Sequence, residues 1–503
     1  MREHSCNSTA STIHTCQWEN MPEVMANLPV TLRSAAIRHK ASTDARNAPG
    51  VNSADTASAI RLFLRCAFPT RNALPNRILT SMVSACAPRT PQRESPLAHR
   101  LSLNYQSNSN CVRLETIMHR FRTAVFGTGF VGRVHLEGIR RLGFVHVYAI
   151  GESNAEKARQ LGEEFHVDKT DSDYHKILED PAVDAVHVCT PNVLHFPMVR
   201  DALQAGKHVI CEKPLATSVE QAAELVALAR QTGRRNCTFH NLRFYPLVQQ
   251  MRRMREAGDL GEILVVQGTY SQDWLLYDTD WNWRLDSKAN GRSRCLADIG
   301  SHFCDMAEHV TGARITSLCA DIQTFHKTRK RPKGSIETFA GKTLAPEDYQ
   351  EVPIDTEDYG GVIFRMGDRT RGAFTVSQVA AGRKNGLNIE IYGSKASVAW
   401  NQERPDELWI GHRNTPNEII IKDPSLLKEA ARPYADLPGG HSEGYDDTFK
   451  QVFRRFYNSI DDPAAAPQYP QFADGLRQLQ ILESELASAD RRAWVDVPAF
   501  QPA

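Results

Sequence analysis

The chain has 503 residues, which allows two to four domains on length alone. Its hydrophobic content of 41% and charged content of 24% are ordinary for a globular protein, and the formal net charge is only +1. Such a balanced charge creates no field to attract nucleic acid or an anionic membrane, and no run of about 18 apolar residues could span a bilayer. We therefore expect neither nucleic acid nor membrane as a partner.

The first 117 residues differ in composition from the rest of the chain. They contain 12 Arg against one Lys, only seven acidic residues and no sustained period of a helix or a strand. Such a segment buries too little apolar surface to offset chain entropy, so residues 1–117 are expected to be disordered. A transit peptide has a similar composition, but Glu3, Glu19 and Glu23 argue against it. We favour an artefactual or non-functional extension, with the folded chain opening near Met118.

The 11 cysteines are spread along the chain, five before Met118 and six after it. No two of them form a Cys-x-x-Cys pair, which is the spacing of a zinc knuckle or a redox dithiol. We therefore predict idle or buried thiols in the reducing cytoplasm, and no metal site.

A glycine-rich turn follows the first strongly apolar segment after Met118. Residues 121–126 predict a strand, and a Gly-x-Gly-x-x-Gly pattern then opens a predicted helix. The first glycine permits a tight turn, the second lets the backbone approach a pyrophosphate, and the third lets helix and strand pack closely. Free N–H groups at the start of the helix would bind the phosphates. The predicted cofactor-binding residues of this turn are Gly127, Thr128, Gly129, Phe130, Val131 and Gly132.

Glu152 ends the second predicted strand, 20 residues past Gly132. A carboxylate at this distance accepts hydrogen bonds from the hydroxyls of an adenosine ribose. Ser153 and Asn154, which follow, are neutral, whereas an NADP site usually has an Arg there. The sequence therefore favours NAD over NADP as the cofactor. In the alternative interpretation, Glu152 only complements the dipole of the next helix.

Strands and helices continue to alternate up to residue 240. Apolar segments at 183–189, 207–211 and 237–240 predict further strands, with helices between them. Repeats of this length are typical of a doubly wound parallel sheet, which we assign to residues 118–240.

Several short motifs make the sequence more specific. They are the glycine turn, Thr190-Pro191-Asn192 with His195, Glu212-Lys213-Pro214, Asn241-Leu242-Arg243-Phe244, and Asp298-Ile299-Gly300-Ser301-His302-Phe303-Cys304-Asp305. In this order, between Arg120 and about Val497, they resemble the Gfo/Idh/MocA family of NAD(P)-dependent oxidoreductases. The resemblance implies a Rossmann domain followed by a substrate-binding domain whose open sheet also makes oligomer contacts.

The resemblance also implies roles for individual residues. Glu212 and Lys213 would bind the cofactor. Lys213 would reach both the nicotinamide ribose and the substrate hydroxyl, and the proline that follows it is often cis. Asp298 and His302 would carry the acid–base chemistry. Thr190, Pro191, Asn192 and His195 would lie beside the nicotinamide.

The chemistry of these side chains agrees with those roles. Asp298 and His302 are spaced i, i+4 and would share one face of a helix. A His with a pKa near 6.5 is a suitable base for a hydroxyl proton, and Asp298 could orient the imidazole or bind a neighbouring hydroxyl. Lys213 would lower the pKa of the substrate alcohol. Taken alone, Asp298 could be a helix N-cap and His302 a core histidine.

Residues 241–503 predict a second domain of α+β class. Several strands between residues 263 and 392 alternate apolar and polar residues, as in a half-exposed antiparallel sheet. A loop over residues 273–284 holds three Trp and three Asp, a composition that suits carbohydrate recognition. Trp281, Trp283 and Arg284 are its predicted substrate-binding residues, although an aromatic core or interface cluster is the alternative. Arg243 and Arg284 would also allow an acidic substrate to bind.

We therefore predict a cytoplasmic dehydrogenase that transfers a hydride from a secondary hydroxyl of a sugar, cyclitol or glycoside to NAD. Lys213, Asp298 and His302 are its predicted catalytic residues, and they also contact the substrate. An NAD-dependent glycosidase or lyase acting through transient oxidation would use the same residues. A non-catalytic dinucleotide-sensing regulator is the alternative from another class. The resemblance implies a homodimer or homotetramer.

Overall fold

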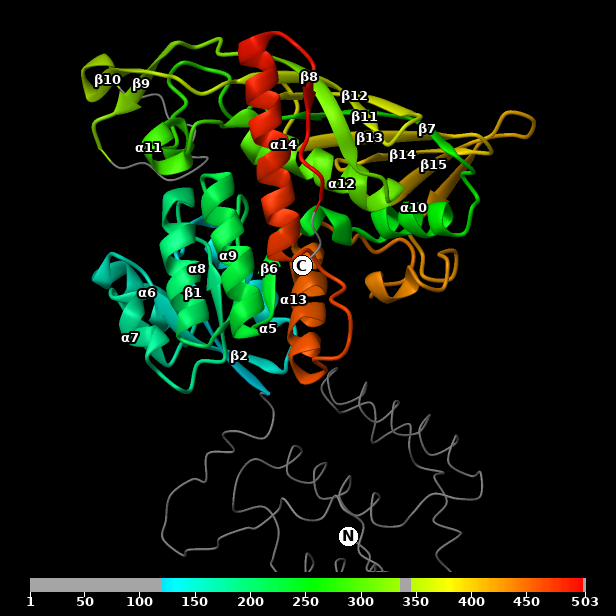
Figure 1. Cartoon of the computed structure of the whole chain (residues 1–503). Helices are drawn as coiled ribbons and strands as arrows, with labels where there is room; N and C mark the ends of the chain where they lie inside the picture. The colour runs from blue at the N-terminus through cyan, green and yellow to red at the C-terminus, as the bar shows by residue number, and fades with distance from the viewer. Residues whose placement is uncertain (1–119, 335–344, 501–503) are drawn as a thin grey trace, which may run out of the picture. The chain divides into compact units, whose positions relative to one another are not determined.

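The computed structural model describes residues 120–334 and 345–500. The first part is a six-stranded parallel sheet with the strand order β3-β2-β1-β4-β5-β6 (Figure 1). Its strands are β1 (Phe121–Phe126), β2 (Val145–Gly151), β3 (Lys169–Asp171), β4 (Ala185–Val188), β5 (His208–Cys211) and β6 (Asn236–Thr238). The predicted doubly wound sheet is confirmed. The expectation of disorder at residues 1–117 falls outside the described residues.

Helices cover both faces of this sheet. They are α5 (Phe130–Arg140), α6 (Ala155–Glu164), α7 (Tyr174–Leu178), α8 (His195–Gln204) and α9 (Val219–Thr232). Successive residues of β1 alternate between two cores: Phe126 packs in the core of α8 and α9, and Val125 in that of α5. Side-chain caps start three of the helices: Asn154 accepts from the Lys157 N–H of α6, Asp173 from the His175 N–H of α7, and Ser218 from the Gln221 N–H of α9.

The helix α13 (Tyr445–Asp461) completes the core on the α5 face, although it follows α5 by more than 300 residues in the chain. Its Phe449 and Phe453 are fully buried there. A Cβ atom on Gly138 of α5 would lie 3.0 Å from the Phe453 ring and 3.2 Å from the Cβ of Phe449. The two helices approach so closely because this position has no side chain.

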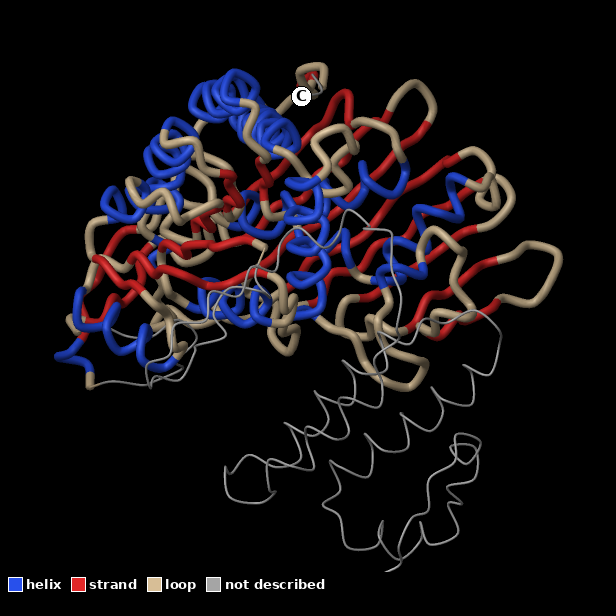
Figure 2. The backbone as a smooth tube through the Cα atoms, turned by 90° about the horizontal axis from the view of Figure 1, so that it is seen from below, coloured by secondary structure: helices blue, strands red, loops and turns tan. Residues whose placement is uncertain are grey.

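The second sheet has nine strands in the order β16-β15-β14-β13-β7-β12-β11-β8-β17. Figure 2 draws the strands in red, side by side. Its pairs are antiparallel except for β7 with β12. The strands are β7 (Ile263–Ser271), β8 (Ile315–Gln323), β11 (Tyr359–Met366), β12 (Thr370–Ser377), β13 (Gly386–Gly393), β14 (Ser397–Asn401), β15 (Glu407–Gly411), β16 (Glu418–Ile421) and β17 (Val495–Asp496). A separate hairpin pairs β9 (Thr328–Pro332) with β10 (Tyr349–Pro353). The expected open, mainly antiparallel sheet is confirmed.

Helices pack on one face of the nine-stranded sheet. They are α10 (Pro246–Glu256), α12 (Ser301–Thr311) and α14 (Phe472–Arg491), and the short α11 (Ser287–Asn290) lies nearby in the chain. Met251, Phe303 and Leu486 of these helices share one core with Phe374 of β12, and this core continues to α8 and α9 of the first sheet. One apolar core therefore joins the two sheets. Within the described residues, no helix combines the length and the apolar composition that crossing a membrane requires.

Candidate active site

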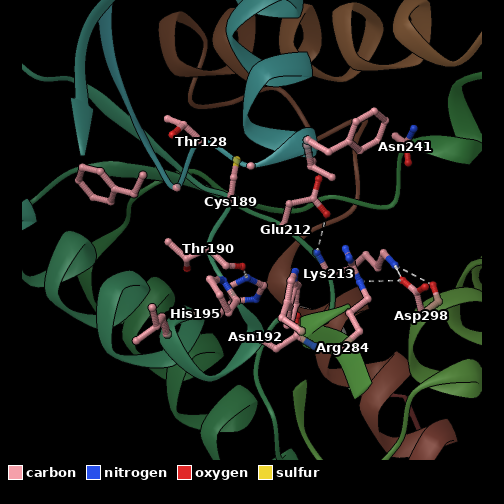
Figure 3. A pocket seen from close by; sticks show the side chains of 18 of the residues that line it. Thr128, Cys189, Thr190, Asn192, His195, Glu212, Lys213, Asn241, Arg284 and Asp298 are labelled. Atoms are coloured by element: carbon pink, nitrogen blue, oxygen red, sulfur yellow. Dashed lines mark hydrogen bonds and ion pairs between the residues drawn. The ribbon is translucent and has the colours of Figure 1, made fainter. Parts of the chain in front are cut away.

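A cavity of about 790 Å³ lies where strands of both sheets end (Figure 3). Residues that follow β1, β2, β4, β5 and β7 line it, in keeping with the rule that open α/β sheets bind ligands outside the carboxyl ends of their strands. Sixteen predicted site residues line this cavity: Gly127, Thr128, Gly129, Phe130, Val131, Glu152, Thr190, Pro191, Asn192, His195, Glu212, Lys213, Trp283, Arg284, Asp298 and His302.

The glycine turn has the shape that a dinucleotide pyrophosphate requires. Gly127 has a positive φ of 82°, and a Cβ atom on it would lie 2.8 Å from the Cys189 carbonyl oxygen. A Cβ on Gly132 would lie 2.1 Å from the Gly127 oxygen, so this glycine permits the close packing of α5 on the turn without lining the cavity. A Cβ on Gly129 would meet nothing within 4 Å. No side chain caps α5, so its first N–H groups are available to phosphate oxygens.

Glu152, just after β2, is held in place by donors from Thr128, Ser153 and Lys157. Its Oε2 accepts from Thr128 Oγ1 at 2.5 Å and from Lys157 Nζ at 3.0 Å. Burial alone would raise the pKa of Glu152, but these hydrogen bonds outweigh burial and lower the pKa. The ionised carboxylate has the chemistry to accept ribose hydroxyls, and the residues of this end of the cavity fit NAD.

His195 connects the loops that follow β4 and β5. Its Nδ1 lies 2.7 Å from the Pro214 carbonyl and its Nε2 lies 2.9 Å from the Thr190 carbonyl. Burial lowers the pKa of His195, so the ring is neutral and donates to one of the two carbonyls. The Lys213–Pro214 peptide bond is cis. His195 thus fixes the turn that presents Lys213, in addition to lining the cavity.

Lys213 and Asp298 form an ion pair in the wall of the cavity (Figure 3). Lys213 Nζ donates to Asp298 Oδ1 at 2.6 Å and to the Asp298 carbonyl at 2.7 Å. Gln378 Nε2 donates to Asp298 Oδ2 at 2.9 Å, and Arg284 Nε lies 3.8 Å from Oδ1. Burial would raise the pKa of Asp298, but the charges of Lys213 and Arg284 lower it. Asp298 is therefore a carboxylate that fixes the ammonium group of Lys213.

His302 is buried, and its Nδ1 has no hydrogen-bond partner among the described residues. Burial, followed by the charge of Lys213, lowers the pKa of His302 well below its usual value, so the imidazole is neutral and can accept a proton. Asp298 does not bond to this ring, because its two oxygens are taken by Lys213 and Gln378. Asp298 lies in a π-helical turn, Leu296–Gly300, that leads into α12.

Glu212 begins a buried chain of hydrogen bonds that leads away from the cavity. Its Oε1 lies 3.1 Å from His135 Nε2, His135 Nδ1 lies 2.8 Å from His187 Nδ1, and His187 Nε2 lies 2.8 Å from the Tyr457 hydroxyl. If Glu212 is ionised, each link has one consistent direction: Tyr457 donates to His187, His187 to His135, and His135 to the carboxylate. The other oxygen, Oε2, accepts from the Lys213 N–H at 3.1 Å.

Two predicted substrate-binding residues do not line this cavity. The guanidinium of Arg243 is buried, and it donates to both oxygens of Asp305 and to Asp474. Trp281 packs against Leu285 of a small apolar cluster, with the guanidinium of Arg331 5.3 Å from its ring centre. The position of Trp281 therefore fits the alternative interpretation, in which this loop forms an aromatic cluster. Trp283, two residues away, lines the cavity.

Other cavity residues were missed by the sequence analysis. Several lie at or just past the end of β7 or in the loop after β12: they are Tyr270, Gln272, Lys384 and Asn385, joined by Asn241, Tyr174, Lys157 and Tyr445. Asp273 and Trp274 also line the cavity, and they belong to the loop over residues 273–284 that the sequence assigned to carbohydrate recognition. Because β7 and β12 are parallel, their carboxyl ends meet at one edge of the sheet. Polar residues placed directly after an apolar strand, such as Gln272, are the signal that could have found them.

The chain matches two family models in sequence order. The oxidoreductase family with an NAD-binding Rossmann fold matches residues 121–240, and the GFO/IDH/MocA C-terminal domain matches residues 248–399. The levoglucosan dehydrogenase of Pseudarthrobacter phenanthrenivorans is 28% identical over 399 residues, covering 76% of this chain and 99% of that protein. The NAD-dependent scyllo-inositol 2-dehydrogenase of Bacillus subtilis is 28% identical over 201 residues, covering 40% of this chain and 56% of that protein.

A solved structure agrees with these matches. Levoglucosan dehydrogenase in complex with NADH and L-sorbose superposes with a TM-score of 0.68 at 27% identity, covering 76% of this chain and 100% of that one. The relatives are dehydrogenases of sugars and cyclitols, and the expected NAD cofactor is confirmed. Since the two family models reach into both sheets, the chain belongs to the Gfo/Idh/MocA family of NAD-binding oxidoreductases.

Proposed function

We propose that the protein is a dehydrogenase that oxidises a secondary hydroxyl of a sugar, cyclitol or glycoside with NAD. The observation that carries this proposal is one cavity that contains a dinucleotide turn, a lysine fixed by a carboxylate and a buried neutral histidine. Each of these groups has a defined task in alcohol oxidation. When bound, NAD supplies the hydride acceptor.

The side chains of the cavity accept the proton and stabilise the developing charge. His302 accepts the hydroxyl proton, because its imidazole is neutral and lines the cavity. Lys213 donates to the hydroxyl oxygen and stabilises the negative charge that develops there. Asp298 holds the ammonium group of Lys213 in place, and Gln378 in turn holds Asp298.

The far end of the cavity suits a polyhydroxylated substrate. Trp283 offers a flat face with the guanidinium of Arg284 4.5 Å from its ring centre. Gln272, Asp273 and Asn385 add donors and acceptors for hydroxyl groups. Since the relatives include dehydrogenases named for levoglucosan and scyllo-inositol, these two compounds are rational first substrates.

A substrate panel with NAD and with NADP tests the proposal. We expect NADH to accumulate with at least one sugar, cyclitol or glycoside. Lys213→Met is expected to abolish turnover while NAD still binds, since the glycine turn and Glu152 are intact. Lys288→Met, an exposed residue outside the cavity, is the matched control and should retain activity.

The same panel separates the competing functions. Turnover of a glycoside without net NADH would instead indicate a glycosidase or lyase that reoxidises its cofactor. NAD binding without turnover of any compound would favour a dinucleotide-sensing regulator. Near-normal turnover by Lys213→Met would contradict the proposed role of this lysine.

We also propose that the protein works in the cytoplasm as a homodimer or homotetramer. The six cysteines in the described residues are free thiols, which fits a reducing compartment. Large apolar side chains are exposed on strands of the nine-stranded sheet: Leu264, Val265, Ile363, Ile419 and Ile421. Such exposure favours pairing of this sheet with a second copy. The mass in solution, measured by light scattering, tests this, and a monomer at micromolar concentration would contradict it.

A further inference from the structure

A second cavity, of about 430 Å³, shares no lining residue with the active site. It lies between α10, the end of α12, the segment before α14 and Phe500 near the end of the described chain. Four arginines line it: Arg243, Arg252, Arg253 and Arg314. Asp474 is the one acidic residue that lines it.

Carboxylates fix three of these arginines in place. Arg243 donates to Asp305 and Asp474. Arg252 Nε donates to Glu256 Oε1 at 2.8 Å, and Arg253 Nη1 donates to Glu256 Oε2 at 2.6 Å. Neither Asp305 nor Glu256 lines the cavity, so these acids hold the guanidinium groups from outside it while offsetting part of their positive charge.

Arg314 is fixed in the same way. Its Nη1 donates to Glu308 Oε2 at 2.6 Å, and its guanidinium lies 3.9 Å from the ring centre of Phe500. Among the described residues, Nη2 of Arg314 and Nη2 of Arg252 make no hydrogen bond. Donors of both residues therefore remain available to an anion. Because these side chains are already held in place, little conformational entropy is lost when the anion binds.

His309 lines the cavity without a charge of its own. Its Nδ1 accepts from Arg252 Nη1 at 3.0 Å, which requires an unprotonated ring nitrogen. Burial lowers the pKa of His309 well below its usual value, and the charges of Arg243, Arg252 and Arg253 lower it further. The charge of the cavity therefore comes from arginine alone and does not change near neutral pH.

We propose that this cavity binds a phosphate group, either as inorganic phosphate or as the ester of a small metabolite. Guanidinium groups match the geometry of phosphate oxygens and bind them through paired hydrogen bonds. The ligand is a small anion because the cavity is roughly half the volume of the active-site cavity. Nothing in the proposed dehydrogenase chemistry uses these residues, so this is a second ligand site.

Calorimetric titration of the NAD-saturated protein at low salt tests this site, because bound NAD occupies the other phosphate-binding region. Inorganic phosphate and glycerol 3-phosphate are the two probes. Tighter binding of glycerol 3-phosphate would identify an ester as the ligand, and equal affinities would identify the phosphate group alone. Arg252→Gln combined with Arg314→Gln is expected to weaken binding about tenfold or more, since the two available guanidinium donors are lost.

Two further variants make the result decisive. Arg292→Gln alters an exposed arginine outside the cavity and should leave binding unchanged. Gln468→Glu places a carboxylate at an exposed cavity position, so the protein should fold normally and bind phosphate more weakly. The site is refuted if the wild type binds neither probe at millimolar concentration, or if the arginine double variant and Arg292→Gln bind equally. Dehydrogenase turnover is not an output of this test, so failure of one proposal is distinguishable from failure of the other.

Discussion

Glu152 and Lys157 form an ion pair at the adenosine end of the active-site cavity. The carboxylate would select NAD in two ways. It offers an acceptor to the ribose hydroxyls, and it would repel the 2′-phosphate that distinguishes NADP. It also occupies the ammonium group of Lys157, which would otherwise be a partner for that phosphate.

Replacing Glu152 should therefore change the cofactor preference. In Glu152→Ser, we expect kcat/KM with NAD to fall about tenfold or more, because hydrogen bonds to a charged acceptor are lost. Efficiency with NADP should rise, since Lys157 is released to bind the 2′-phosphate. Steady-state kinetics with both cofactors measure the change. Glu156→Ser, at an exposed site on α6 four residues further along the chain, is the control. An unchanged ratio of the two efficiencies would show that Glu152 does not contact the ribose.

Glu485 of α14 makes stability depend on pH. Burial, followed by the charge of Glu357, raises the pKa of Glu485 to about 8. Because this pKa exceeds that of an unfolded chain, the native state favours the protonated carboxyl. Its contribution to stability is complete below about pH 4.5 and is lost as the pH rises through about 8.

The variant Glu485→Gln, which is neutral at every pH, should remove that dependence. We expect its unfolding midpoint to match the wild type near pH 5 and to exceed it by a few degrees near pH 9. Thermal unfolding followed by circular dichroism gives both values. Glu483→Gln, at a partly exposed position on the same helix, should leave the pH dependence of the wild type intact. A constant difference between Glu485→Gln and the wild type across this range would contradict a titrating Glu485.

At the scale of elements, the chain from Glu212 to Tyr457 ties α13 to β4 and α5. Tyr457 contributes a hydroxyl donor from α13, His187 lies on β4, and His135 lies on α5. Each group is buried, so a missing partner would not be replaced by water. The helix α13 therefore binds the first sheet through polar contacts as well as through its aromatic rings.

Removing the Tyr457 hydroxyl should cost stability. We expect Tyr457→Phe to lower the free energy of unfolding by about 1–3 kcal/mol, because the buried Nε2 of His187 loses its donor. Urea unfolding measures the loss. Tyr277→Phe changes an exposed hydroxyl and is expected to have little effect. Equal stability of the two variants would mean that the chain of hydrogen bonds contributes nothing measurable.

The elements differ in how far sequence could predict them. The glycine turn could be predicted from the sequence because its constraints are local: Gly127 needs a positive φ and Gly132 needs close packing. The buried position of Arg243 could not be predicted from the sequence, because its partners Asp305 and Asp474 are 62 and 231 residues away in the chain. Trp281 and Trp283 lie in a loop without periodicity, so nothing in the sequence tells which of the two faces the cavity.

At the scale of the whole molecule, the family likeness covers the chain only from about residue 120 onward. Levoglucosan dehydrogenase aligns over 99% of its own length with 76% of this chain. Both sheets, the active-site cavity and the arginine-lined cavity are formed by described residues that follow Arg120. Nothing that we assign to function requires residues 1–117.

Expression from Met118 tests that conclusion. We expect the shortened protein to match the full chain in kcat, KM and unfolding midpoint, because it retains every residue of both cavities. A panel of active substrates, followed through NADH formation, compares the two. The full-length chain prepared in parallel is the control. Loss of activity in a folded, shortened protein would assign a function to the first 117 residues.

The position of α13 has a consequence for synthesis on the ribosome. Residues 121–238 supply all six strands of the first sheet, but the apolar face around Val125 and Ile139 is completed only by Phe449, Phe453 and their neighbours. More than 200 residues must be translated between the last of these strands and the helix that covers them. The nascent sheet therefore exposes an uncovered apolar face throughout that interval, which makes the growing chain a substrate for chaperones and leaves C-terminally truncated products prone to aggregation.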